Sequence, residues 1–293
     1  MASTRAARAL TPLTLVLLIS QAAIVVTGGA VRLTGSGLGC PTWPECTPGS
    51  YVPVENQAEG VFHSWIEFAN RLLTFVLVAF ALATLIAVFR AGRKDLRILA
   101  AGQFSGIFGQ GVLGGITVLT NLNPISVASH FLLSTILIAA ATSLHTRRKG
   151  PAIKTGIRGP LSSYSKTHMM WAALVIILGT VVTGAGPHAG DINAPRLHIR
   201  IQEAAMLHGT AVLVLLLFTV AFYLRKDITH TTKNRLLIFL GISLAQGVIG
   251  YIQYLQGVPE LLVATHLLGS TLVWIAAWRI WLSVQFKAKE IAQ

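Results

Sequence analysis

Eight long apolar runs constrain this chain more than any other feature of its sequence. About 20 consecutive apolar residues suffice for a helix to cross the hydrocarbon core of a bilayer. Only 11 % of the residues are charged, against about 25 % in a typical soluble protein. The pattern predicts an all-α membrane protein with eight transmembrane helices. The expected spans cover roughly residues 11–31, 61–89, 98–119, 124–146, 165–186, 201–224, 234–256 and 259–284.

The first run has the general pattern of a signal peptide, because Arg5 and Arg8 precede an apolar stretch. That stretch extends from about Leu10 to Val31, which is long enough to span a membrane. No Ala-x-Ala-like cleavage site follows soon after it. We therefore expect residues 11–31 to be retained as a transmembrane helix.

The net charge of +13 lies in short clusters between the apolar runs. A nucleic-acid-binding protein gathers its basic residues on one accessible face, so no nucleic-acid partner is expected. If the loops alternate across a bilayer, the side with the N-terminus collects nineteen lysines and arginines and the other side four. The positive-inside rule then places both termini in the cytoplasm. These features predict a multi-pass protein of a bacterial-type plasma membrane.

The sequence also repeats itself along the chain. The segment Gln-Gly-Val-Leu-Gly at 110–114 matches Gln-Gly-Val-Ile-Gly at 246–250, and His130 matches His266 at the same offset. Val-Thr-Gly at 26–28 is repeated at 182–184. Both halves begin on the same side of the membrane, which is the pattern of a parallel duplication with its axis along the membrane normal.

The duplication predicts two tandem, pseudo-symmetric four-helix bundles. The first comprises residues 1–149 and the second residues 165–293. Residues 150–164 are basic and contain glycine and proline, so they are expected to form a cytoplasmic linker.

Three of the nine histidines lie inside apolar runs at one depth: His130, His208 and His266. Each is six or seven residues from the outer end of its predicted helix, about 10 Å deep at the rise of an α-helix. Ionisable groups at such depth usually face a bundle interior and carry function. One histidine would more often be a neutral core residue bonded to a neighbouring helix. Three at one depth, two of them repeat-related, favour a binding site.

The other histidines are expected to be solvated or peripheral. His145, His168 and His230 fall at the cytoplasmic edge or in loops, and His188 and His198 fall in an outer loop.

The ligand that best suits the three deep histidines is haem. A zinc site needs further cysteine, carboxylate or histidine ligands close by, and none lies at matching depth in the second half. Haem iron takes one or two imidazoles from facing helices. His208 and His266 are therefore predicted to ligate one haem b from both faces.

In the first half, the repeat places Asn70 opposite His130, where the second half has His208. An N-terminal haem would then have one strong ligand and an open face. Glu67 lies one helical turn before Asn70 on the same side of the helix. It can form a structural ion pair with Arg71 or Arg32, and either arginine equally suits a haem propionate.

Three segments of the sequence resemble the haem A synthase family. They are residues 28–46, residues 66–71, and the paired Gln-Gly-Val-x-Gly segments with the histidines that follow them. The resemblance covers essentially all eight predicted helices. It implies that the N-terminal bundle takes haem O as substrate and that the C-terminal bundle holds haem b. It further implies oxidation of a ring methyl of haem O to a formyl group, which gives haem A for cytochrome oxidase.

The resemblance also assigns roles to individual residues. The family's second-helix pattern is Glu-x-x-His-Arg, which here reads Glu67, Asn70 and Arg71. Glu67 is thus implied to be the catalytic carboxylate and His130 the axial ligand of the substrate haem. Asn70 departs from the pattern, and with Arg71 and Arg32 it is expected to line the substrate haem. His63, one turn before Glu67, is an alternative ligand nearer the outer surface.

Cys40 and Cys46 match the outer-loop cysteine pair of the family. They would face the oxidising side of the membrane, so a disulfide is expected. The pair is either structural or exchanges electrons or disulfides with a partner. A haem O synthase, cytochrome oxidase assembly factors and a second copy of the chain are candidate partners.

Two other functions fit parts of the pattern. A non-catalytic di-haem b electron carrier, linked to quinol, would use the same histidines. A transporter would account for the parallel repeat and the intramembrane Glu67, but it has no use for three histidines at one depth.

Overall fold

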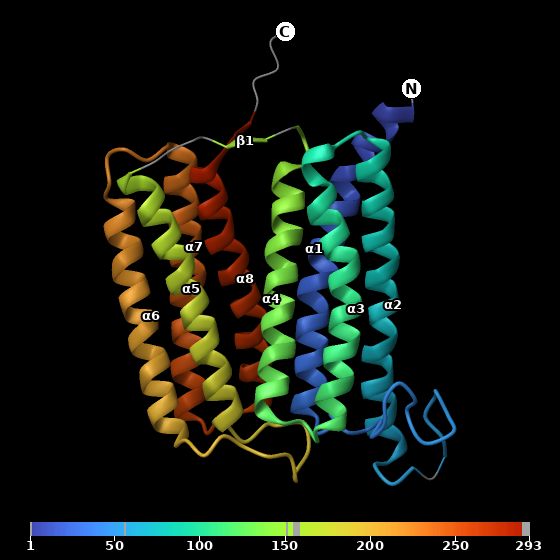
Figure 1. Ribbon diagram of the computed structural model, residues 1–293. Helices are drawn as coiled ribbons and strands as arrows, with labels where there is room; N and C mark the ends of the chain where they lie inside the picture. The colour runs from blue at the N-terminus through green and yellow to red at the C-terminus, as the bar shows by residue number, and fades with distance from the viewer. Residues whose placement is uncertain (1, 56, 151, 155–158, 289–293) are drawn as a thin grey trace.

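The computed structural model describes residues 2–55, 57–150, 152–154 and 159–288. Within these residues eight long α-helices run side by side, as Figure 1 shows. The helices are α1 (Ala2–Leu33), α2 (Val61–Arg90), α3 (Arg97–Leu119), α4 (Pro124–Arg147), α5 (Pro160–Ala185), α6 (Ile201–Tyr223), α7 (His230–Leu255) and α8 (Glu260–Gln285). A 3₁₀ turn, η1 (Lys94–Leu96), precedes α3. The predicted all-helical fold is confirmed, with one addition: β1 (Ala152–Lys154) pairs antiparallel with β2 (Phe286–Ala288).

The helices pack in two rings of four. In the first ring α1 contacts α2 and α4, and α3 contacts α2 and α4. In the second ring α5 contacts α6 and α8, and α7 contacts α6 and α8. The rings meet where α8 lies against α1 and α4, and where α4 lies against α5. Consequently α2 faces α4, and α6 faces α8, across the middle of a ring.

Seven of the helices in the described part of the chain are long and apolar enough to cross a membrane. The protein is therefore a multi-pass membrane protein. The eighth predicted span, α3, forms a helix of matching length but is not among the seven. Its six glycines and two glutamines lower its mean hydropathy, although it packs in the same ring as α2 and α4.

Several helices begin earlier than the apolar runs do. α5 starts at Pro160, because proline suits the first helical position. α7 starts at His230, where the side chain of Thr229 accepts a hydrogen bond from the backbone N–H of Thr232. The predicted linker at 150–164 therefore loses its last five residues to α5. Residues 151 and 155–158 of that linker lie outside the described residues.

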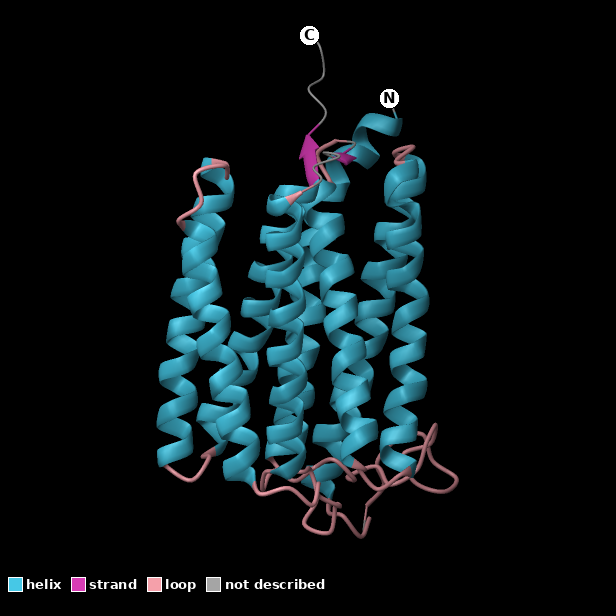
Figure 2. Ribbon diagram, turned by 60° about the vertical axis from the view of Figure 1, so that its left-hand side comes forward, coloured by secondary structure: helices cyan, strands magenta, loops and turns pink. Residues whose placement is uncertain are grey.

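The two ends of the molecule differ in their loops. The start of α1 and the β1–β2 pair lie at one end, and the long connections 34–60 and 186–200 lie at the other (Figures 1 and 2). The histidines at positions 130, 208 and 266 are all nearer the end that carries the long connections.

Hydrogen bonds from two tryptophans of α8 join the two rings. The indole N–H of Trp274 on α8 donates to the carbonyl of Thr135 on α4 at 2.7 Å. One turn further along α8, the indole N–H of Trp278 donates to Oγ of Ser143 at 2.7 Å. If α8 slid along α4, these polar groups would lose their partners in apolar surroundings, which is costly. The two hydrogen bonds therefore set the register of α8 against α4.

The expectation that His168 is solvated is wrong. Its side chain is completely buried, its Nε2 lies 3.1 Å from Oγ1 of Thr219, and its ring packs edge-on against Phe239. The cause is the early start of α5, which puts His168 two turns inside the helix on the face that packs in the ring. His145 is likewise half-buried, with Nδ1 3.1 Å from Oγ1 of Thr14, whereas His230 is exposed as expected.

Candidate functional site

His208 and His266 lie on α6 and α8, which face each other across the second ring. Their imidazoles are close enough to interact electrostatically. The Nδ1 atom of His208 is 3.1 Å from the carbonyl oxygen of Val175. Because a carbonyl only accepts, Nδ1 carries the proton and Nε2 keeps its lone pair. Histidines that ligate metals commonly show this arrangement.

Each deep histidine ring lies against a glycine of a neighbouring helix. A Cβ atom at Gly250 would be 3.2 Å from Cε1 of His266, and one at Gly114 would be 3.1 Å from Cε1 of His130. His208 lies in the same way against Gly179. The Nδ1 atoms of His130 and His266 are buried and lack a hydrogen-bond partner.

These residues fit haem ligation. The second ring offers two imidazoles from opposite helices, and the first ring offers His130. Each imidazole lies close to a glycine, where an added Cβ atom would be 3.1–3.4 Å from Cε1 of the histidine. The two unpartnered Nδ1 atoms are the atoms that would point away from an iron bound at Nε2.

Asn70 does not offer the first ring a second free ligand. Its Oδ1 accepts a 2.7 Å hydrogen bond from Oγ1 of Thr27 on α1, and its Nδ2 lies beside Gly28. On the other side of α1, a side chain at Gly29 would collide with Leu267, which neighbours His266 on α8. The two adjacent glycines thus let α1 pass closely between the two candidate sites.

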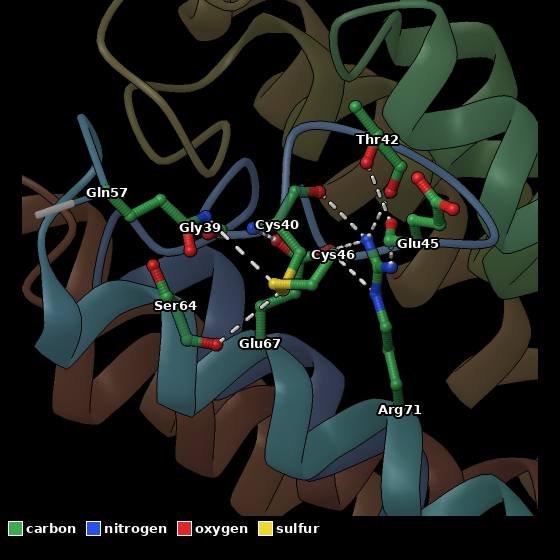
Figure 3. A network of polar contacts seen from close by, with 9 residues as sticks. All are labelled: Gly39, Cys40, Thr42, Glu45, Cys46, Gln57, Ser64, Glu67 and Arg71. Carbon is green, nitrogen blue, oxygen red and sulfur yellow. Dashed lines mark hydrogen bonds and ion pairs between the residues drawn. A yellow bond between two sulfur atoms is a disulfide. The ribbon is translucent and has the colours of Figure 1, made fainter. Parts of the chain in front are cut away.

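Glu67 is nearly completely buried, with 6 % of its surface exposed. Its Oε2 accepts a 2.7 Å hydrogen bond from the backbone N–H of Cys40, and its Oε1 accepts from Nη2 of Arg71 at 2.6 Å (Figure 3). The predicted ion pair of Glu67 is therefore formed with Arg71 and not with Arg32. Both carboxylate oxygens have partners in this arrangement.

Arg71 also holds the connection between α1 and α2. It donates to the backbone carbonyls of Cys40, Thr42 and Glu45 at 2.8, 3.1 and 3.2 Å. The same loop is closed by the predicted Cys40–Cys46 disulfide, which the structure contains. Figure 3 shows the guanidinium reaching from α2 to the loop beside the disulfide. Sequence reasoning missed this loop contact, because residues 34–60 show no periodicity that predicts their path.

The remaining candidate residues contact other elements. Arg32 donates from Nη2 to the carbonyl of Thr183 on α5 at 2.7 Å, and so links the two rings. The Nδ1 atom of His63 lies 2.8 Å from Oγ of Ser36 in the connection 34–60. His188 donates from Nε2 to the carbonyl of Val258 at 2.7 Å, which links the connection 186–200 to the turn between α7 and α8.

Comparison of the sequence with known proteins identifies the family of this chain. The family profile COX15-CtaA, described as cytochrome oxidase assembly protein, matches residues 11–191. The chain belongs to this family, which is that of the haem A synthases. The predicted resemblance is thereby confirmed.

Individual relatives agree with this assignment. A haem A synthase of Brucella anthropi is 27 % identical over 88 % of this chain and 87 % of that protein. One of Azorhizobium caulinodans is 28 % identical over 87 % of this chain and 88 % of that protein. One of Geobacillus thermodenitrificans is 31 % identical, but the match spans 45 % of this chain and 42 % of that protein. The chain thus aligns with under half the length of some relatives and with most of others.

Proposed function

We propose that this chain is a haem A synthase, which oxidises a ring methyl of haem O to a formyl group. Residues 1–149 would hold haem O and residues 165–293 would hold haem b. The observation that carries the proposal is an asymmetry between two similar rings. At the depth of the three deep histidines, the second ring has two facing imidazoles, whereas the first has the single imidazole of His130, an engaged amide at Asn70 and a buried carboxylate at Glu67.

Two imidazoles suit a resident haem that transfers electrons, because both axial positions of the iron are filled. A single ligand leaves one face of a porphyrin open. The helix contacts support the proposed duplication, since each ring has the same order of neighbours. The basic residues concentrated at one side support cytoplasmic termini in a plasma membrane, with the haem sites toward the outer face.

A bound haem O would supply both the reacting methyl group and the iron. The protein would supply position and charge. His130 would hold the haem from one side, and Glu67 would place a carboxylate where positive charge develops or a proton leaves. A preorganised charge in a site shielded from water stabilises a transition state without the cost of reorienting solvent. Arg71 would hold Glu67 in place through its 2.6 Å ion pair.

The alternative is a non-catalytic di-haem b electron carrier. It is favoured by one observation, which is that both oxygens of Glu67 are already engaged by Cys40 and Arg71. In that case the carboxylate would serve only to hold the outer loop. Under either proposal, the second ring would hold a haem b that transfers electrons.

Co-expression with a haem O synthase separates the two functions. Pigments extracted from such cells should contain haem A when this chain is present. They should contain only haem O and haem b when it is absent. If cells contain the membrane-inserted, haem-loaded protein but no haem A, the proposal of a haem A synthase is wrong, and the electron carrier is favoured.

A further inference from the structure

Each ring contains a complementary pair of buried polar atoms without partners. In the first ring they are Nδ1 of His130 and Oε1 of Gln110, and in the second Nδ1 of His266 and Oε1 of Gln246. An imidazole that keeps Nε2 free for a metal is a donor at Nδ1, whereas an amide oxygen is an acceptor. Buried polar groups are normally paired, so each pair calls for an explanation.

Both glutamines lie on the helical turn that faces the histidine ring. Gln110 precedes Gly114 by four residues, and Gln246 precedes Gly250 by four, which puts each glutamine on the same face as the glycine. A Cβ atom added at either glycine would lie 3.1 or 3.2 Å from Cε1 of the histidine concerned. The repeated Gln-Gly-Val-x-Gly segment is therefore the surface on which the imidazole sits.

Further contacts place the amides beside the histidines. Nε2 of Gln110 donates to the carbonyl of His130 at 3.2 Å and to Oγ of Ser134 at 2.7 Å. In the second ring, a Cβ atom at Gly269 would collide with the amide of Gln246, so that amide lies one turn from His266 on α8. The backbone carbonyl of Gln246 is also close to the His266 imidazole.

We propose that Gln110 and Gln246 are positioning residues for the axial histidines. When His130 or His266 ligates haem through Nε2, its Nδ1–H donates to Oε1 of the glutamine. This bond would require rotation about the last side-chain torsion of glutamine, which has broad minima. Nε2 of Gln110 would then exchange its bonds to His130 and Ser134 for the new contact. His208 needs no such glutamine, because the carbonyl of Val175 already accepts from its Nδ1. The inference rests on the haem sites of the proposed function.

The effect of such a bond is known from metal sites in general. A partner on the outer nitrogen fixes the orientation of the ring and makes the histidine a more basic ligand. A more basic ligand stabilises ferric over ferrous haem. Gln246 would therefore lower the reduction potential of the haem b, and Gln110 would aim the ligand of the substrate haem.

The test uses the purified protein with haem b incorporated during expression. Gln246→Leu removes the hydrogen-bond acceptor and keeps a side chain of similar size. Gln246→Glu changes the amide but retains an oxygen that can accept the hydrogen bond. Gln202→Leu, at an exposed position on the neighbouring α6, is the matched control. Haem content, the reduction potential of bound haem and the ferric electron paramagnetic resonance spectrum are measured for each protein.

Gln246→Leu should weaken haem binding by about 10–100-fold, the usual cost of losing such a partner. The haem that remains should have a higher reduction potential and altered resonance positions. A tenfold change in the one-electron equilibrium corresponds to about 59 mV. Gln246→Glu should restore the wild-type potential or lower it further, and Gln202→Leu should match the wild type.

A wild-type potential and spectrum in Gln246→Leu would overturn the inference, even with reduced haem content. The glutamine would then only pack, or the backbone carbonyl at position 246, which the leucine variant keeps, would be the partner. Wild-type protein without a low-spin haem would instead overturn the haem site itself, together with this inference. The two failures are thus distinguishable, and neither depends on formation of haem A.

Discussion

The backbone N–H of Cys40 donates a hydrogen bond of 2.7 Å to Oε2 of Glu67. This contact joins the disulfide loop between α1 and α2 directly to the carboxylate proposed to be catalytic. Arg71 contacts both partners, since it donates to the carboxylate of Glu67 and to the backbone carbonyl of Cys40. The loop and the carboxylate of Glu67 therefore hold each other in position. A substitution in one should change the position of the other.

Glu67→Gln should retain haem O but lose formyl product. Glutamine keeps the size of the side chain and an oxygen for the N–H of Cys40, whereas the charge is lost. Loss of one well-placed electrostatic group typically costs about 10²–10³ in rate. Haem extraction and chromatography of the pigments measure both quantities. Haem A formation at the wild-type rate would exclude a catalytic role for Glu67.

Arg71→Ala should expose the disulfide to reductants. The loop would lose three carbonyl contacts, and hydrogen bonds to charged groups contribute roughly 1.5–3 kcal/mol each. Dithiothreitol should reduce the Cys40–Cys46 disulfide about tenfold faster or more. Maleimide labelling of the freed thiols in intact membranes measures this rate. Arg200→Ala, which removes an exposed ion pair with Glu203, is the control. Equal rates in both variants would show that Arg71 does not protect the loop.

His208→Ala and His266→Ala should each abolish the low-spin haem b spectrum of membrane-inserted protein. Each removes one of the two facing imidazoles. His168→Phe is the informative contrast, because His168 is a buried histidine of the same ring that contacts Thr219 and not the other imidazoles. That variant should keep the spectrum. A full low-spin spectrum in purified His266→Ala would mean that the ligands are elsewhere.

Asn70→His should shift haem in the first ring toward a six-coordinate, low-spin spectrum. It restores the imidazole that the repeat places opposite His130. Asn70→Ala should leave the coordination nearly unchanged, because the amide is a poor iron ligand and its oxygen is engaged by Thr27. The measurement is the optical spectrum of protein loaded with haem O. Complete loss of N-terminal haem in Asn70→Ala would show that Asn70 itself holds the porphyrin.

The stability of the helix end at Asp95 should depend on pH in the acid range. Hydrogen bonds from Arg93, at 2.9 Å to each carboxylate oxygen, lower the pKa of Asp95 from 3.8. The folded state thus favours the ionised form. Its stabilisation is present above about pH 4 and is lost as the pH falls through the lower folded pKa.

Asp95→Asn should therefore lower the free energy of unfolding at pH 7 by up to about 1 kcal/mol, and the difference from wild type should shrink toward pH 3. Thermal unfolding in detergent measures it. Asp227→Asn is the control, because Asp227 pairs with Arg225 at the exposed surface, where ion pairs contribute little. A difference that stays constant down to pH 3 would contradict the role of the Asp95 charge.

Sequence alone predicted the features that depend on local chemistry. The start of α4 is an example, because the predicted span begins at residue 124, as the helix does. The structure adds the local reason: Pro124 suits the first turn, and the side chain of Asn123 accepts from the backbone N–H of Ile125. The disulfide was likewise predictable, since Cys40 and Cys46 are the two cysteines of the chain.

What sequence could not predict depends on which helix faces are buried and where the loops run. His145 and His168 look alike in the sequence, yet one is half-buried beside Thr14 and the other is sealed among aromatic rings. Arg71 looked equally suited to a haem propionate or to Glu67. Its contacts with three loop carbonyls follow from a loop path that no local pattern encodes.

Gly28 and Gly29 have a further consequence for the molecule as a whole. At this end of α1 they leave bare backbone between Asn70 on one side and Leu267 on the other. Packed protein interiors are nearly incompressible and transmit displacement. A shift of α1 and α2 would therefore press on α8, the helix that carries His266. If each half holds a haem as proposed, loading of the first half would displace the second through this contact, without a hinge or a moving domain.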